Sequence, residues 1–346
     1  MAHAWKACWV HALAGSNPAS SASWTSTNAG QPPQGLARRL RSGSDEEGLP
    51  VTDHEAVRAF YAEPGAMTSS GEHAALVDAL PADLDQLVSI VHGSGIYDVV
   101  ASDFYGVDLP DDRQAKIHVR RYAEMLDELT GDGHGPLAEA RPPDQRLACR
   151  CRNFTLLLLG PLRAKGIPAR ARYGFAAYFN PGHYEDHVVC EYWNAAEERW
   201  QLVDPQLDEV WRERLGIDFD VLDVPRDQFL VAADAWQRCR RDGADPERSG
   251  ISFADLHGLW FVAGNLVRDL AALNKTEMLS WDVWGAQPGP DQQLDAGQLA
   301  FFDQLALLTR EPDASFDQLR ETYRDDDRVR VPHQVHNALL DRSEPV

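Results

Sequence analysis

The stretch from Cys149 to Asp204 most constrains the fold, because several regular elements follow one another there with little between them. Residues 153–165 contain a dense block of leucines long enough for a helix, and Gly166 follows as a stop signal. Segments rich in aromatic, small and β-branched residues come next, at 169–179, 186–193 and 200–204. The pattern predicts one helix packed against a small antiparallel sheet.

The last two strand segments are separated by the polar turn 194–199, which predicts an antiparallel hairpin. A register that sets His187 opposite Asp204 also sets Trp193 opposite Glu198, with a four-residue loop between them. Loops of that length are common in hairpins. We therefore expect the Asp204 carboxylate to lie beside the His187 ring.

Cys151 precedes the leucine block, at the expected N-terminus of the helix. Free amide groups and the positive end of the helix dipole favour a thiolate at this position. A thiol, an imidazole and a carboxylate thus follow in chain order, as nucleophilic catalysis by cysteine requires. Pro161 lies inside the expected helix, where a proline costs about 3 kcal/mol, so we expect a kink near Gly160.

Four motifs occur in a fixed order: Cys151-Arg152-Asn153-Phe154, Gly166-Ile167-Pro168-Ala169-Arg170, Asp186-His187-Val188-Val189-Cys190-Glu191-Tyr192-Trp193 and Trp200-Gln201-Leu202-Val203-Asp204. Together they resemble the transglutaminase-like superfamily, and more narrowly a bacterial transglutaminase-like group whose substrate the motifs do not define. The core of the resemblance covers residues 147–208, and the narrower one extends through 260–270 and 281–285.

The resemblance implies that Cys151 is the nucleophile, His187 the general base and Asp204 the residue that orients the base. It also implies an α+β fold with a transglutaminase-like (papain-like) core, in which the helix bearing Cys151 packs on an antiparallel sheet between flanking helices. Two positions depart from the family pattern. Asn153 stands where aspartate is more common, and Val188 stands where tryptophan is expected.

Two alternatives compete for the same residues. Cys149 is a second thiol near the helix start, but the Arg-Asn-Phe that matches the family follows Cys151. Cysteines together with His183 and His187 are also zinc's preferred ligands. However, His187 and Cys190 are three residues apart, so on a regular strand they point to opposite faces. We expect Cys190 to pack in the core, and we expect neither a metal nor an organic cofactor.

Composition excludes several partners. A formal net charge of -21 repels phosphate backbones, which argues against nucleic acid. The chain has no apolar run long enough to span a membrane. Five cysteines, an odd number at irregular spacing, do not resemble a disulfide framework, so a reducing cytoplasm is expected. The apolar run 7–14 is short for a signal peptide and contains His11.

The chain divides into three parts. Residues 1–50 are rich in Ser, Ala, Gly and Pro, which predicts a disordered extension or, as an alternative, translated sequence ahead of a start at Val51. Residues 51–310 form the expected transglutaminase-like domain, with helical N- and C-terminal parts. Residues 311–346 are charged and are expected to form a peripheral tail.

Periodicity predicts helices on both sides of the central stretch. They are His54–Tyr61, a helix ending near Leu80, Asp83–His92, Arg113–Leu129, Asp208–Leu215, Val231–Arg241, Phe253–Leu273 and Gln298–Thr309. His118 is interpreted as a packed or surface histidine rather than a site residue. Asn265, Arg268, Asp269 and Asp282 are interpreted as helix caps and buried ion pairs, with the active cleft as the alternative.

Two functions remain open at this point. The first is cysteine-dependent acyl transfer or hydrolysis at an amide, of the transglutaminase, protease or amidase type, through a thioester intermediate. Its substrate would be a peptide or protein amide, or a small amide. The second is a non-catalytic transglutaminase-like module that serves in binding or assembly. The sequence does not distinguish water from an amine as the acyl acceptor, and it does not define the oligomeric state.

Overall fold

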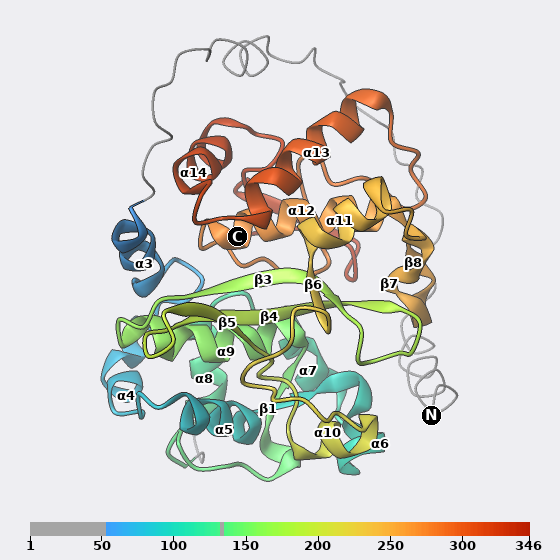
Figure 1. The fold of residues 1–346 in the computed structure, drawn as a ribbon. Coiled ribbons are helices and arrows are strands. Elements are labelled where there is room, and N and C mark those ends of the chain that lie inside the picture. The colour runs from blue at the N-terminus through green and yellow to red at the C-terminus, as the bar shows by residue number, and fades with distance from the viewer. Residues whose placement is uncertain (1–52, 132–134) are drawn as a thin grey trace.

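The computed structural model describes residues 53–131 and 135–346, and within these ranges the chain has an α+β fold. A six-stranded sheet lies between two layers of helices (Figure 1). The expected α+β class is therefore confirmed. The predicted extension over residues 1–50 and the candidate start at Val51 lie outside the described residues.

The central sheet is mostly antiparallel. Its strands are β3 (Ala169–Ala176), β4 (Tyr184–Asn194), β5 (Arg199–Val203), β6 (Phe229–Val231), β7 (Ser249–Ile251) and β8 (Leu256–His257). β3 and β4 form the centre, and β6 pairs with the outer edge of β3. The other edge of β4 is shared, because β5 pairs along its second half and β7 runs parallel to its first residues.

The hairpin of β4 and β5 forms as expected, but its register differs from the prediction by two residues. Trp193 pairs with Trp200, and Cys190 pairs with Val203. Glu198 adopts a left-handed backbone conformation with φ 52°, which closes the turn just before β5. Because the shift is even, every side chain keeps its predicted face. β5 ends at Val203, so Asp204 begins the next loop instead of pairing across from His187.

One face of the sheet is covered by α9 (Cys151–Ala164), which carries Cys151 at its first position (Figure 1). Residues 151–163 of α9 are all buried, which explains the leucine block, since a helix enclosed on all sides needs no polar face. α9 continues through Pro161 without a break. Around α9 lie α4 (Ala74–Asp78), α5 (Leu84–Ser94), α6 (Ala101–Tyr105), α7 (Asp111–Gln114), α8 (Tyr122–Thr130) and α10 (Glu209–Leu215).

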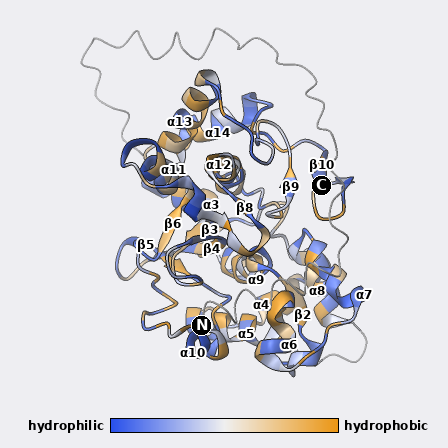
Figure 2. Cartoon of the chain, turned by 90° about the vertical axis from the view of Figure 1, so that its right-hand side faces the viewer, coloured by the Kyte–Doolittle hydropathy of each residue, from blue (hydrophilic) through white to orange (hydrophobic). Residues whose placement is uncertain are grey.

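The opposite face of the sheet is covered by α12 (Leu259–Leu273), which is also buried along nearly its whole length. Outside it lie α11 (Ala232–Arg241), α13 (Ala296–Arg310) and α14 (Phe316–Asp325), with α3 (His54–Ala62) at the side. Figure 2 shows hydrophilic and hydrophobic residues side by side along outer helices such as α6 and α13, as expected for helices with one solvated face. Short 3₁₀ helices complete the path: Gly71–His73, Asp98–Val100, Ala115–His118, Pro143–Gln145, Pro246–Arg248 and Ser252–Ala254.

Two helix predictions were too long. The expected helix Arg113–Leu129 is broken at Val119, which is extended, so that α7 and a 3₁₀ turn precede α8. The carbonyls of Val119 and Arg120 leave the helix path and accept hydrogen bonds from the Arg152 guanidinium. The expected helix Phe253–Leu273 begins only at Leu259, because Gly258 at φ 113° interrupts it.

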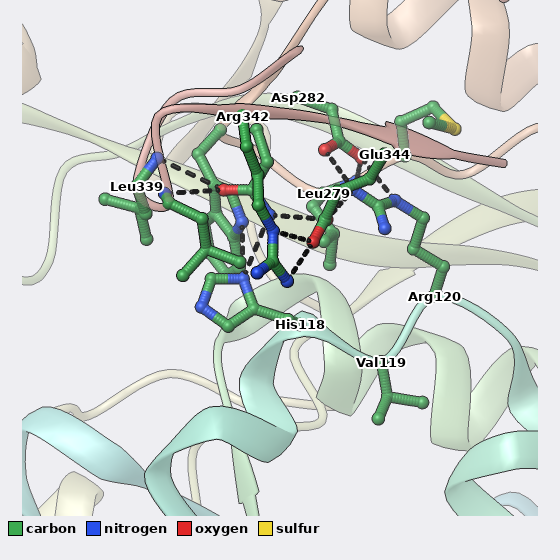
Figure 3. Close-up of polar contacts among 12 residues, drawn as sticks. His118, Val119, Arg120, Leu279, Asp282, Leu339, Arg342 and Glu344 are labelled. Carbon is green, nitrogen blue, oxygen red and sulfur yellow. Dashed lines mark hydrogen bonds and ion pairs between the residues drawn. The ribbon is translucent and has the colours of Figure 1, made fainter. Parts of the chain in front are cut away.

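The C-terminal segment also differs from the expected peripheral tail. β10 (Gln334–Asn337) pairs with β11 (Arg342–Pro345) and with β9 (Asp282–Val283), and Leu319, Val329 and Val335 are buried in the core. Figure 3 shows Arg120 facing both Asp282 and Glu344, at Nη2–O distances of 2.7 and 2.9 Å. The charged residues of this segment therefore bind the domain and do not only face solvent.

A parallel pair of short strands lies next to the N-terminus of α9. β1 (Gly95–Tyr97) pairs with β2 (Leu147–Cys149), so the chain reaches Cys151 from a fixed strand. Across the described ranges, no helix is both long enough and apolar enough to cross a membrane.

Candidate active site

Cys151 occupies the first position of α9 and is 7% exposed. Arg150 before it is extended, with φ -113° and ψ 174°, and its backbone N–H donates to Asn153 Oδ1 at 3.1 Å. Asn153 Nδ2 in turn donates to the Val119 carbonyl at 3.3 Å. An aspartate at position 153 would lack that second donor.

Two arginines fix the start of α9. Arg150 pairs with Asp98 through both carboxylate oxygens, with an Nη2–Oδ2 distance of 2.9 Å. Arg152 is buried and donates to the backbone carbonyls of Val119, Arg120 and Glu277. Because a guanidinium offers five donors in a rigid plane, these contacts hold the residues on both sides of Cys151.

His187 lies on β4, is 2% exposed, and faces the layer of α9. Its Nε2 lies 2.8 Å from Asp204 Oδ2, and the Cys151 side chain is close enough to raise the pKa of His187. Since Nε2 is engaged by the carboxylate, Nδ1 is the ring nitrogen left for the thiol. The structure thus brings together Cys151, His187 and Asp204, the three predicted site residues.

Asp204 is fully buried, and both of its carboxylate oxygens are engaged. Oδ2 accepts from His187 and, at 2.6 Å, from the Tyr178 hydroxyl, while Oδ1 accepts the backbone N–H of Gln206 at 3.0 Å. The backbone N–H of Asp204 donates to the Val221 carbonyl at 2.9 Å. Such a carboxylate has little freedom to rotate, so it orients the His187 ring.

The electrostatics of the site favour a protonated imidazole. Burial opposes the charge on His187, but the Asp204 carboxylate and the contact with Cys151 outweigh it and raise the pKa of His187 to about 10. Burial and then the Asp204 charge raise the pKa of Tyr178 well above its usual value, so its hydroxyl remains a donor. The protonated imidazole therefore lies between the Asp204 carboxylate and the Cys151 sulfur.

A pocket of about 560 Å³, including space that opens to solvent, lies over the thiol and the imidazole. Phe179 forms part of its wall, with its ring centroid 4.9 Å from that of His187. The lining residues are Tyr97, Arg150, Cys151, Phe179, Glu185, Asp186, His187, Gln206, Trp211, Ile251, Phe253, Ser280 and Trp281. Because this volume includes open solvent, it does not define the size of a ligand.

The other described cysteines do not lie at the pocket. Cys149 and Cys190 are fully buried, and burial raises the pKa of each thiol well above its usual range. Cys239 is half-buried on α11, where burial raises its pKa to about 11. Cys151 is therefore the one cysteine among the described residues that lines the pocket. Within the same ranges, no group of three or more His, Cys, Asp or Glu side chains is arranged to hold a metal ion.

Val188 is fully buried next to His187. Its carbonyl accepts a hydrogen bond from Thr155 Oγ1 on α9 at 2.9 Å. The residue thus links the strand that carries His187 to the helix that carries Cys151. His183, on the turn before β4, is half-buried and does not line the pocket.

The polar residues predicted as caps or ion pairs are partners of other side chains. Asp269 pairs with Arg172 at 2.9 Å, and Asp282 pairs with Arg120. His118 Nδ1 accepts from Trp281 Nε1 at 3.2 Å, and burial lowers the pKa of this histidine. Asn265 and Arg268 do not line the pocket, but Asn265 Nδ2 donates to the pocket residue Asp186 at 2.7 Å.

Several pocket residues were not predicted from the sequence. Phe179 is one of them, because a strand pattern does not distinguish a pocket wall from a core. Gln206, Ser280 and Trp281 lie in loops, where no periodicity indicates which way a side chain points. The sequence offered one signal for Gln206. It follows Asp204 by two residues, so the chain is still close to the site at that position.

No family model, no curated protein and no solved structure matches this chain.

Proposed function

We propose that this protein is a cysteine enzyme of the transglutaminase-like type, which transfers or hydrolyses an acyl group at an amide. Cys151 is the nucleophile, His187 the base and Asp204 the residue that orients the base. The observation that carries the proposal is that the His187 ring contacts the Cys151 thiol on one side and the Asp204 carboxylate on the other, within one pocket. The motifs that resemble the transglutaminase-like superfamily surround the same three residues.

The reactive form is the ion pair in which His187 already holds the proton of Cys151, and the Cys151 thiolate attacks the substrate carbonyl. The carbonyl oxygen gains negative charge, and the amide N–H groups at the start of α9 are its donors, because the first amides of a helix have no intrahelical acceptor. His187 then gives its proton to the leaving amine, and a thioester remains on Cys151. Water or a second amine attacks the thioester, and the thiol is regenerated.

Each step uses groups of this chain and the substrate, with no metal or organic cofactor. Asp204 keeps the Nε2 side of His187 engaged, so that Nδ1 exchanges the proton with the thiol. Aromatic walls such as Phe179 and Trp211 lower the local dielectric constant beside the pair and strengthen these interactions. A peptide or protein amide, or a small amide, is the proposed acyl donor.

The test is the rate of iodoacetamide labelling of each cysteine, followed by peptide mass spectrometry between pH 6 and 9. We expect Cys151 to be labelled near neutral pH at least about tenfold faster than Cys149 or Cys190, because an adjacent imidazolium favours the thiolate. His187→Ala should remove this advantage. His183→Ala is the matched control, since His183 lies on the same hairpin outside the pocket.

A Cys151 labelling rate no higher than that of the buried cysteines, in a folded wild-type protein, would contradict the proposal. The second hypothesis, a transglutaminase-like module for binding or assembly, predicts that outcome. One observation favours it: Cys151 and His187 are only 7% and 2% exposed, so the pair is well covered. Circular dichroism of each variant establishes that a lost rate is not lost folding.

A further inference from the structure

Asp186 is the pocket carboxylate whose charge is least compensated. It precedes His187 on β4 and lines the same pocket. Asn265 Nδ2 donates to its Oδ1 at 2.7 Å, and no other hydrogen bond or ion pair reaches this carboxylate within residues 53–131 and 135–346. The nearby Arg268 donates instead to Asn265 Oδ1, at 2.9 Å. Burial raises the pKa of Asp186 and outweighs the opposing effects of Arg268, Asn265 and His187.

The other charged groups of the pocket are occupied. Glu185 accepts from Asn180 Nδ2 at 3.1 Å, from the Ser252 backbone N–H at 3.1 Å and from the Ser252 hydroxyl. The Arg150 guanidinium is paired with Asp98. Asp186 therefore provides the negative charge in this pocket that is left for a ligand.

Two further residues that line the pocket each carry a buried acceptor atom without a partner among the described residues. Gln206 is 3% exposed, and its Oε1 has no hydrogen bond within the described part of the chain. Ser280 Oγ is likewise buried and without a hydrogen bond there. A buried polar atom without a partner costs about 1–3 kcal/mol, so a ligand that donates hydrogen bonds is favoured at this place. The surrounding walls are aromatic: Tyr97, Phe179, Trp211, Phe253 and Trp281.

We propose that this pocket contains a subsite for an organic cation, an ammonium or guanidinium group, which binds the Asp186 carboxylate and donates to Gln206 Oε1 and Ser280 Oγ. A cation supplies several N–H donors, cancels the charge of a half-buried carboxylate and is attracted to aromatic faces. The inference rests on the proposed function, because it states that the substrate carries a positive charge close to the group that reacts with Cys151.

The test compares three methanethiosulfonates of similar size, which carry an ammonium group, a sulfonate group or no charge. The Cys151 thiolate attacks the thio sulfur, a mixed disulfide forms and methanesulfinate leaves. Peptide mass spectrometry gives the rate at Cys151 and, as an internal reference for the overall charge of the protein, at the half-buried Cys239. The ratio of the ammonium rate to the neutral rate isolates the effect of charge from the reactivity of the thiol.

We expect this ratio at Cys151 to exceed the ratio at Cys239 by about tenfold, as for one poorly screened carboxylate near the thiol. Asp186→Asn should bring the two ratios close together. Asp317→Asn removes the same charge from an exposed site on α14 and should leave the ratio at Cys151 unchanged. In the wild type, the ratio of the sulfonate rate to the neutral rate should be lower at Cys151 than at Cys239.

Equal ratios at Cys151 and Cys239, or a Cys151 ratio that Asp186→Asn does not change, would overturn the inference. Slow reaction of Cys151 with the neutral reagent as well would instead contradict the proposed function, so the two failures are distinct.

A second pair of measurements locates the cation on the acyl donor or on the acyl acceptor. For the donor, p-nitrophenyl guanidinobenzoate is compared with p-nitrophenyl benzoate as an acylating agent, with p-nitrophenolate as the leaving group. For the acceptor, the acetyl thioester formed from p-nitrophenyl acetate is divided between water and 1,5-diaminopentane. Asp186→Asn should weaken the preference for the cationic compound in one of the two steps. No effect in either step would show that the subsite does not serve the substrate.

Discussion

At the scale of single residues, the site depends on how His187 is held between its two neighbours. The Asp204 carboxylate has three donors, from His187, Tyr178 and the backbone of Gln206, so its position is fixed before any substrate arrives. The thiol of Cys151 meets the remaining side of the ring. Buried charge is stable only where it is paired, so folding and the ionisation of His187 are coupled.

This coupling predicts a pH dependence of stability. An unfolded histidine has a pKa of about 6.5, whereas the folded pKa of His187 is raised to about 10. The folded state therefore binds the proton more tightly, and the resulting stabilisation is complete below pH about 6.5 and is lost as the pH rises toward 10. The free energy of unfolding should exceed that of His187→Gln by an amount that shrinks between pH 7 and 9, by at most about 1.4 kcal/mol per pH unit.

Urea denaturation of the wild type and of His187→Gln at several pH values measures this difference. His183→Gln is the control, since His183 forms no ion pair in the part of the chain that the structure describes. A gap between wild type and His187→Gln that stays constant across the pH range would mean that His187 is neutral in the folded protein.

Residue types and chain order were sufficient to predict that Cys151, His187 and Asp204 meet, because a helix start and a hairpin place them at one end of a sheet. The exact pairing was not predictable: the turn closes two residues away from the expected register, and Asp204 acts from a loop. Tyr178 and Gln206 contact the site through loop geometry, which no local pattern encodes. Their roles required the tertiary structure.

At the scale of elements, α9 is the helix on which both the core and the site depend. It is enclosed by the sheet, α5 and α8, so its positions are set by close packing and not by solvent. Gly160 lies against the Tyr122 ring of α8, and a Cβ there would come within 2.4 Å of ring carbons. Tyr122 is itself buried, with 1% of its surface exposed.

Gly160→Ala should therefore destabilise the protein, although alanine is normally the better helix former by about 1 kcal/mol. We expect the free energy of unfolding to fall by about 1–3 kcal/mol, as for other overpacked cores, in urea denaturation at pH 7. Gly289→Ala is the matched control, because no heavy atom lies within 4 Å of the added Cβ. A higher free energy of unfolding for Gly160→Ala would contradict this prediction. It would mean that α8 can move away from α9 at little energetic cost.

Element predictions succeeded where periodicity alone decides and failed where tertiary contacts redirect the chain. α3, α5, α10, α11 and α13 begin and end within two residues of their predicted bounds. The predicted helix Arg113–Leu129 breaks because the Arg152 guanidinium binds carbonyls at 119 and 120, which would otherwise belong to the helix. That arginine lies far along the sequence, so the break has no local signal.

At the scale of the whole molecule, the C-terminal segment returns to the pocket instead of trailing from the domain. The backbone N–H of Ala338 donates to the Trp281 carbonyl at 3.0 Å, next to a residue of the pocket wall. Glu344 accepts from Asn337 Nδ2 and Arg120 Nη2, each at 2.9 Å (Figure 3). The last strands thus connect the loop of Ser280 and Trp281 to the helical layer that carries Arg120.

This connection can be tested with Glu344→Gln, which keeps the shape of the side chain and removes its charge. Burial opposes that charge, but the donors from Asn337, Arg342 and Arg120 lower the pKa of Glu344 to about 2. Loss of a charged hydrogen bond at a site 13% exposed should reduce the free energy of unfolding by about 1–2 kcal/mol at pH 7. It should also raise the labelling rate of Cys151, because the wall formed by Ser280 and Trp281 becomes looser.

Asp325→Asn is the control for this variant. Asp325 also pairs with an arginine, but both side chains are largely exposed, so solvent screens the pair and no measurable change in stability is expected. Urea denaturation and iodoacetamide labelling are measured on the same samples of both variants. Should Glu344→Gln match Asp325→Asn in both measurements, the C-terminal strands would not support the pocket, and only the sheet and α9 would determine the reactivity of Cys151.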